Sequence, residues 1–423
     1  SKQHTNKHCV NSYILYDLLN ATSIGSGVFL RIIFTFKVVC ETLLASNLAQ
    51  SNLENMQFID IKAIHQKSSS QIDAAIAKVF EHGRYINGPE VYELEATLGE
   101  FLGGTKPLDC VAVASGTMAL EVALRALDIG SGDEVITTPF TWISTAETIA
   151  LVGAKPVFAD IRADTYNIDP REVEKRITAK TKAIIAVNLF GQMADYCALE
   201  AIAEKHGLQI IEDAAQSFGA EQNGRKSGTI GAVSCTSFFP AKPLGGYGDG
   251  GAVFTSDELL GEALRAVTNH GCKEHESHDI LGTNGRCDSL QAAIIQAKFA
   301  NFHNEEIALR QQVGARYSEA LKDHLTVPVI HPGNTHIYAQ YTIRPRDRSS
   351  LREALKAADI PSAVYYRKPL HQQAVFADLP CAKKTFPETE KAAKEVISLP
   401  FHPYLSESEQ DRIIATVIAH ERA

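Results

Sequence analysis

Lys242 is the residue whose surroundings most strongly suggest chemistry. It follows two aromatic residues and a proline and precedes a glycine-dense turn, in the stretch SFFPAKPLGGYGDGGAVF at 237–254. The glycines from Gly246 to Gly251 also satisfy G-x-G-x-x-G, the dinucleotide-binding pattern. That pattern needs a helix directly after its glycines, because the helix N-terminus holds the pyrophosphate. Here the glycines lead into GAVFTS, which has the composition of a strand, so Lys242 is the candidate reactive group and the glycines shape the chain around it.

Two other short stretches carry groups that could act with this lysine. The sequence SGT at 115–117 closes an expected strand and opens an expected helix, where backbone N–H groups and the helix dipole favour an anion. Asp213 and Gln216 follow another expected strand, in EDAAQSFG. Since the carboxyl ends of parallel strands meet at one crevice, these groups should converge on Lys242. Pyridoxal phosphate needs such a set: a lysine for its aldehyde, a carboxylate for its ring nitrogen, and amides and hydroxyls for its phosphate.

A group of potential metal ligands crowds the sequence NHGCKEHESHDI, namely His270, Cys272, His275 and His278. Zinc requires its ligands in a fixed tetrahedral arrangement. The polar composition of this stretch favours a mobile loop instead. We therefore expect no metal here and a loop that covers substrate.

The elements that must position these residues follow an α/β pattern. Short apolar runs, separated mostly by helical stretches such as 117–127 and 198–207, predict a parallel sheet covered on both faces. The seven expected strands are 110–115, 134–139, 155–160, 183–190, 208–215, 233–239 and 251–256.

The pattern changes after residue 256, where long helices precede a mixture of strands and helices. The expected elements are helices at 289–302, 305–322, 349–359 and 406–421 and a strand at 338–345. We therefore predict a large domain over 56–310 and a smaller α+β domain over 311–423.

Residues 1–55 are expected to be an extension of doubtful structure. The first methionine is Met56, and NMQFIDIKAIH around it resembles a natural start. The apolar stretch 27–45 contains Arg31, Lys37 and Glu41, which argues against a membrane span. No convincing signal-peptide cleavage pattern is present.

Charge and cysteine content narrow the class of protein. The net charge is −9, the pI is near 5.9, and no long basic block occurs, so neither nucleic acid nor a membrane surface is an expected partner. The eight cysteines are scattered and form no C-x-x-C pair. This argues against a disulfide framework and predicts a cytoplasmic protein.

Three stretches together resemble the sugar aminotransferases of the DegT/DnrJ/EryC1/StrS family: SFFPAKPLGGYGDGGAV, EDAAQSFGA and GTNGRCDSLQAAII. The resemblance extends from about Phe58 to the C-terminus. It implies the fold type I architecture of pyridoxal-phosphate enzymes, with a mostly parallel seven-stranded sheet and a smaller C-terminal domain. Three further stretches, at 83–91, 363–373 and 398–406, resemble members that aminate UDP-linked 3-keto-hexuronic acids.

The resemblance also implies roles in cofactor binding. Lys242 would form the Schiff base with pyridoxal 5'-phosphate and, once released, shuttle a proton, with a pKa lowered by partial desolvation. Some relatives have histidine at this position and are dehydratases, whereas this chain has lysine. Asp213 would pair with the ring nitrogen, and Gln216 would lie near the phenolic oxygen. The remaining cofactor contacts would come from Gly116, Thr117 and Ser237 at the phosphate and from Trp142 stacked on the ring.

Other positions match residues that contact the substrate or the neighbouring subunit. Asn284 would reach the phosphate from that subunit, so the active unit would be a homodimer with shared sites. Arg286 would bind a carboxylate or diphosphate of the substrate. Tyr366 and His371 are candidates for the same pocket.

The implied reaction is transfer of an amino group from L-glutamate to a ketone on a nucleotide-linked sugar. The expected acceptor is UDP-2-acetamido-2-deoxy-3-oxo-glucuronate, for surface-polysaccharide synthesis such as that of lipopolysaccharide O-antigen. Two alternatives remain open: amination of a 4-keto sugar on UDP or dTDP, and a cofactor-binding regulator that does not transaminate.

Overall fold

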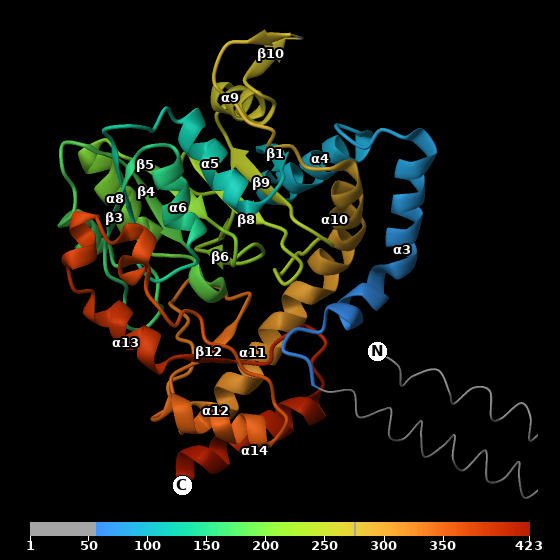
Figure 1. Cartoon of the computed structure of the whole chain (residues 1–423). Coiled ribbons are helices and arrows are strands. Elements are labelled where there is room, and N and C mark those ends of the chain that lie inside the picture. Colours follow the sequence, from blue (N-terminus) through green and yellow to red (C-terminus); the bar gives the residue numbers. More distant parts are fainter. Residues whose placement is uncertain (1–55, 275) are drawn as a thin grey trace, which may run out of the picture. The chain divides into compact units, whose positions relative to one another are not determined.

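The computed structural model describes residues 56–274 and 276–423 (Figure 1). The expected extension over 1–55, with its apolar stretch at 27–45, lies outside the described residues. In the described part of the chain, no helix is long and apolar enough to cross a membrane.

The central element is a seven-stranded sheet with the order β1-β9-β8-β5-β4-β2-β3. The strands from β8 to β3 pair in parallel, whereas β9 runs antiparallel to both β1 and β8. The predicted mostly parallel α/β fold is therefore confirmed. The strands are β1 (Asp109–Val113), β2 (Glu134–Thr137), β3 (Lys155–Phe158), β4 (Thr181–Val187), β5 (Gln209–Asp213), β8 (Val233–Ser237) and β9 (Gly251–Thr255).

Side chains alternate along the strands, so both faces of the sheet bear buried apolar side chains. On β1, Val111 and Val113 pack into one core, and Cys110 and Ala112 pack into the other. The first core lies under α5 (Gly116–Ala126) and α9 (Glu258–Thr268). The second lies under α4 (Pro89–Gly103) and α10 (Ser289–Asn301). Cover on both faces explains why the strands read as almost continuous apolar runs.

A long helical run connects this sheet to a further core in the C-terminal part of the chain, the C-terminal core. Helix α10 continues through a π-helical turn, η2 (Phe302–Glu306), into α11 (Ile307–Leu321), as Figure 1 shows. The C-terminal core contains buried residues of α11, of the antiparallel pair β12 (Tyr341–Ile343) and β13 (Ile397–Leu399), and of α12 (Arg348–Ala357) and α14 (Glu407–Arg422).

The predicted domain boundary near 310 falls inside α11. Residues Met56–Ala423 form one compact unit by their contacts, and Met56 itself packs into the C-terminal core. The division into 56–310 and 311–423 therefore stays a prediction.

The remaining elements cover the sheet edges and the surface. The other helices are α3 (Ile61–His82), α6 (Ser144–Leu151), α7 (Pro170–Glu174), α8 (Tyr196–His206) and α13 (Pro387–Glu395). Short 3-10 turns are η1 (Leu189–Gly191), η3 (Leu370–Gln372), η4 (Ala374–Phe376) and η5 (Pro380–Lys383). Two small hairpins pair β6 (Glu221–Gln222) with β7 (Arg225–Lys226) and β10 (Cys272–Glu274) with β11 (Ser277–His278).

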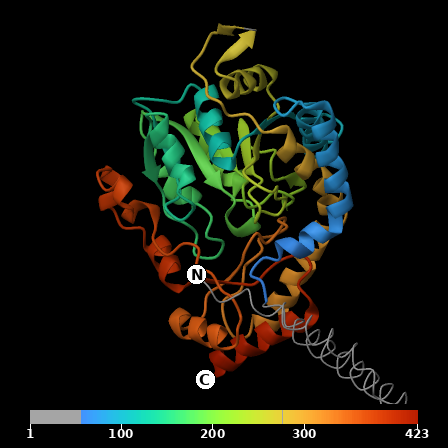
Figure 2. The same ribbon diagram turned by 45° about the vertical axis from the view of Figure 1, so that its right-hand side comes forward.

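The β10–β11 hairpin replaces the loop expected in this region, so that prediction is wrong. Its pairing needs only backbone groups and a tight turn, with Glu276 at a φ of 64°, and none of the apolar alternation that identifies a strand in sequence. Figures 1 and 2 both show the hairpin projecting beyond the sheet. Among the described residues no cluster of three potential metal ligands occurs, and His275 lies outside them.

Candidate active site

The fold brings the predicted chemical groups to one edge of the sheet. Strands β1, β5 and β8 point in the same direction, so their carboxyl ends lie together. Thr117 follows β1, Asp213 ends β5 and Ser237 ends β8, while Lys242 lies in the connection from β8 to β9.

The N-terminus of α5 and the end of β8 form a narrow cradle. Ser115 caps the helix by accepting a hydrogen bond from the Met118 N–H at 3.1 Å. A Cβ atom added to Gly116 would lie 2.6 Å from the Cβ of Ser237, so only glycine permits this approach. The unpaired N–H groups of the first helical turn and the nearby hydroxyls of Thr117 and Ser237 make a site that suits a phosphate.

Asp213 is a buried carboxylate, with 5% of its surface exposed. The Thr145 hydroxyl donates to Oδ2 at 3.0 Å, and the Ala215 N–H donates to Oδ1 at 3.2 Å. Burial raises the pKa of Asp213, while the Ala215 N–H, the charge of Lys242 and the Thr145 hydroxyl oppose the rise. No cation in the described part of the chain lies within ion-pair distance of this carboxylate, which therefore suits a protonated ring nitrogen.

Lys242 is half-buried, and its amino group makes no hydrogen bond or ion pair with any residue that the structure describes. Its backbone N–H donates to the Phe239 carbonyl at 2.8 Å, which fixes the turn. Burial lowers the pKa of Lys242, and attraction to Asp213 opposes this effect. A lysine amine with a lowered pKa is a better nucleophile and base near neutral pH.

Gln216 connects this edge to a distant segment of the chain. Its Oε1 accepts from the Phe190 N–H at 2.9 Å, and its Nε2 donates to the Tyr366 hydroxyl at 3.2 Å. The Tyr366 ring centroid lies 6.5 Å from that of Trp142. Trp142 is 61% exposed, so most of its surface is open to a ligand. Burial raises the pKa of Tyr366, which keeps the phenol protonated.

These groups fit pyridoxal 5'-phosphate. The unpartnered Lys242 amine suits its aldehyde, buried Asp213 suits its ring nitrogen, and the cradle beside Gly116 suits its phosphate. Thr145 is a contact that sequence reasoning missed. Its signal was its position one helical turn after Trp142, in the stretch PFTWISTAE.

Asn284 and Arg286 lie beside the cradle, but their side chains do not reach it. The Gly285 carbonyl accepts from the Ala114 N–H at 2.8 Å, which holds this segment against the end of β1. Asn284 is exposed, and its side chain has no hydrogen-bond partner among the described residues. Arg286 donates to Asn269 Oδ1 at 2.6 Å, and its buried Nε has no acceptor in the same part of the chain.

His371 lies apart from the other predicted site residues. It is buried in η3, its ring centroid lies 4.7 Å from that of Phe386, and Nε2 lies 3.4 Å from Glu390 Oε1. Burial lowers the pKa of His371. No contact in the described structure connects it to Lys242 or Gln216.

Comparison with known proteins yields consistent matches over most of the chain. A model of the DegT/DnrJ/EryC1/StrS aminotransferase family matches residues 66–418. The chain is 50% identical over 351 residues to UDP-2-acetamido-2-deoxy-3-oxo-D-glucuronate aminotransferase of Pseudomonas aeruginosa, covering 83% of this chain and 96% of that protein.

Solved structures match the fold as well. A DegT DnrJ EryC1 StrS aminotransferase from Brucella abortus superposes with a TM-score of 0.83 and 43% identity, covering 87% of this chain and 100% of that one. NtdA from Bacillus subtilis, solved with bound cofactor PMP, has a TM-score of 0.80 and 26% identity, with 88% and 86% of the two chains covered.

Proposed function

The chain belongs to the DegT/DnrJ/EryC1/StrS aminotransferase family, and we propose that it transfers an amino group from L-glutamate to UDP-2-acetamido-2-deoxy-3-oxo-glucuronate. The enzyme is a transaminase whose cofactor is pyridoxal 5'-phosphate. The observation that carries the proposal is the unpartnered Lys242 amine with a lowered pKa near the buried carboxylate of Asp213. The relative that is 50% identical supports the choice of sugar.

When bound, the cofactor would supply an electron sink for the reaction and would carry the amino group from donor to acceptor. Lys242 would hold the cofactor through its Nζ and, once displaced by the donor, would take up the proton of the donor's α-carbon. Its lowered pKa makes the neutral amine available for this step. Asp213 would hold a proton on the ring nitrogen, and the hydrogen bond that Thr145 donates would orient the carboxylate for that contact.

The other site residues bind and orient. Gly116, Thr117 and Ser237 would hold the phosphate at the α5 N-terminus. Gln216, fixed by Phe190 and Tyr366, would lie near the phenolic oxygen.

Binding of the sugar would involve a second copy of the chain. Asn284 is exposed, and the neighbouring Leu281 is 89% exposed, which supports a homodimer in which this segment reaches the other subunit. There Asn284 would bind the cofactor phosphate, and Arg286 would bind the sugar carboxylate or the diphosphate. Tyr366 would line the same pocket, whereas His371 is buried against Phe386 and would reach the pocket only if its neighbours rearranged.

The product would enter surface-polysaccharide synthesis, such as that of lipopolysaccharide O-antigen, in the cytoplasm. The location is supported by the cysteines of the described chain, which are free.

The first experiment is the absorption spectrum of the cofactor-loaded protein before and after L-glutamate, with Lys242→Ala in parallel. Glutamate should replace the visible band by the near-ultraviolet band of the amine form, and the variant should lack the lysine-linked band. A band that no amino donor changes would favour the regulator and refute transamination.

The sugar can be tested through the reverse half-reaction. The aldehyde form should accept the amino group of a UDP-linked 3-amino-hexuronic acid and turn to the amine form. Arg286→Gln should weaken this conversion more for the hexuronic acid than for a neutral amino sugar, because a neutral sugar lacks the carboxylate. Rapid conversion by 4-amino-6-deoxy sugars alone would overturn the proposed acceptor.

A further inference from the structure

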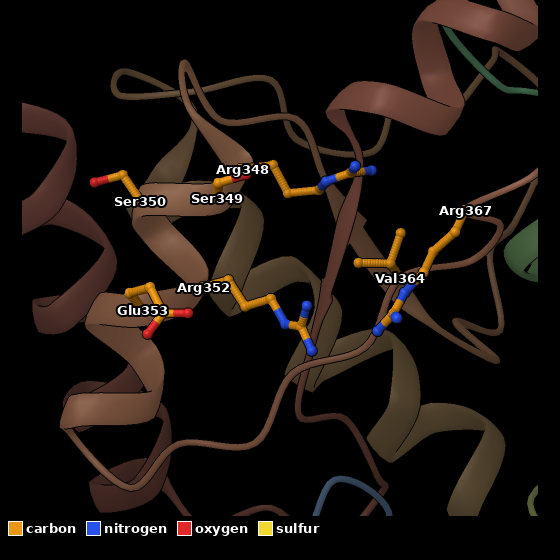
Figure 3. Close-up of a pocket in the computed structure, with 7 residues that line it drawn as sticks. All are labelled: Arg348, Ser349, Ser350, Arg352, Glu353, Val364 and Arg367. Carbon is orange, nitrogen blue, oxygen red and sulfur yellow. The ribbon is translucent and has the colours of Figure 1, made fainter.

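A pocket rich in arginine lies outside the candidate active site, between α12 and the segment around Val364 (Figure 3). It has a volume of about 420 Å³ and is lined by Arg348, Arg352 and Arg367. Figure 3 shows the three guanidinium groups extending from both segments towards the space around Val364. Glu353 also belongs to the lining, and Figure 3 shows it beside Arg352, at the opposite side of the view from Arg367.

The positive charge of this pocket exceeds its negative charge, since three arginines and one glutamate line it. None of the three arginines forms an ion pair with an acidic side chain among the residues that the structure describes. Arg348 donates to the Ala393 carbonyl near the end of α13, which fixes its guanidinium. Burial lowers the pKa of Arg348, and the like charges of Arg367 and Arg352 lower it further. The three cations thus repel one another in the absence of an anion.

The N-terminus of α12 does not bind an anion by itself, because a carboxylate of the chain already caps it. Asp347 caps α12 and accepts from the N–H groups of Ser349 and Ser350 at 2.8 and 3.1 Å. Binding must therefore come from the guanidinium groups. Each guanidinium group presents a planar pair of N–H donors that matches two oxygens of a phosphate. Three such groups offer more donors than one carboxylate can accept, which favours a phosphate or diphosphate.

We propose that Arg348, Arg352 and Arg367 form a binding site for a phosphate or diphosphate group, separate from the cofactor and substrate pockets. Arg348 is held in place by the Ala393 carbonyl, and the exposed Arg352 and Arg367 close on the ligand. The site lies next to the candidate active site along the chain, since Arg367 directly follows Tyr366, whose hydroxyl accepts from Gln216. This inference does not rest on the proposed function.

Calorimetric titration of the full, cofactor-loaded chain with inorganic pyrophosphate tests the site, because bound cofactor occupies the other phosphate cradle. We expect Arg352→Gln and Arg367→Gln each to weaken binding by about tenfold, and the double variant to abolish it. Lys356→Gln is the matched control, since it removes one charge from the same helix without lining the pocket, and it should bind as wild type. Thermal melting checks that each variant is folded.

Further arms identify the source of the anion and the location of its site. Orthophosphate should bind more weakly than pyrophosphate. UDP should bind with an affinity similar to that of pyrophosphate if its nucleoside makes no contact. If Arg286→Gln removes pyrophosphate binding and the Arg352→Gln/Arg367→Gln variant keeps it, the anion binds at the substrate site and the proposal is wrong. Equal binding by wild type and the double variant would also overturn it. Because no arm measures transamination, failure here leaves the proposed function unaffected.

Discussion

Substitution of Gly116 by alanine tests the phosphate cradle most directly. The added Cβ would lie 2.6 Å from Ser237 Cβ and 3.1 Å from its Oγ. The first distance is far inside van der Waals contact, and the atom it meets is close to the β8 backbone, so a rotamer change cannot relieve it. Forcing one methyl group into a filled space costs ~1–3 kcal/mol. The helix gains at most ~1 kcal/mol when glycine becomes alanine.

The substitution should lower both the affinity for the cofactor and the stability of the protein. Relief of the clash moves the N-terminus of α5 away from Ser237, which widens the phosphate cradle. A loss of ~1–3 kcal/mol corresponds to roughly 5- to 150-fold weaker binding. The assay is titration of the apo protein with pyridoxal phosphate, followed by absorbance, together with melting of the apo and loaded forms.

The control is the double variant Gly116→Ala/Ser237→Gly, which removes the clashing Cβ. It should recover the apo stability lost in Gly116→Ala and part of the affinity, with the lost Ser237 hydroxyl accounting for the remainder. Unchanged affinity in Gly116→Ala, with unchanged melting, would refute the argument that the cradle needs glycine.

The remaining predictions concern charge, subunit sharing and pH. Asp213→Asn keeps the size of the side chain but should slow transamination by roughly 10- to 150-fold, because a charged hydrogen bond (~1.5–3 kcal/mol) is lost. The pKa of Lys242 should fall further. Stopped-flow absorbance across pH measures both effects, and an unchanged pH profile would contradict the role of Asp213. Mixing inactive Lys242→Ala and Asn284→Ala chains should restore about a quarter of the activity if one site uses both subunits; no recovery after verified exchange would mean that each chain acts alone. His336 accepts from the Tyr338 N–H, and burial lowers its pKa from 6.5 to about 3. The unfolded chain therefore binds more protons between these values, so stability should fall as pH drops from 6.5 towards 3, and His336→Asn should flatten the loss in urea unfolding.

The sheet was predictable because each strand is a short apolar run bounded by polar or turn residues. The direction of β9 was not, since the run 251–255 has the composition of its parallel neighbours. The absence of a helix between Ser237 and Gly251 is what makes β9 antiparallel, because a parallel neighbour needs a crossover. The β10–β11 hairpin left no signal, since the sequence around it has no alternation of apolar residues.

The positions of the candidate site residues were predictable where those residues end a strand, as Asp213 and Ser237 do. Contacts made across the chain were not visible in composition: the 3.2 Å bond between Gln216 and Tyr366 joins residues 150 positions apart. The family resemblance implied that Tyr366 and His371 are candidates for the same pocket as Arg286. In the structure the Leu370 N–H donates to the Pro139 carbonyl at 2.8 Å, and the His371 ring packs against Phe386.

Burial acts in opposite directions on the two central groups of the site, since it raises the pKa of Asp213 and lowers that of Lys242. Each therefore depends on the other's charge to remain ionised. If Lys242 is engaged with a ligand as a neutral group, Asp213 loses that support and needs another positive partner, which a protonated ring nitrogen provides. A protonated ring bound beside both groups would therefore favour a neutral Lys242 amine together with an ionised Asp213 carboxylate. That mutual dependence explains why a lysine in a glycine turn and an aspartate at a strand end form one site.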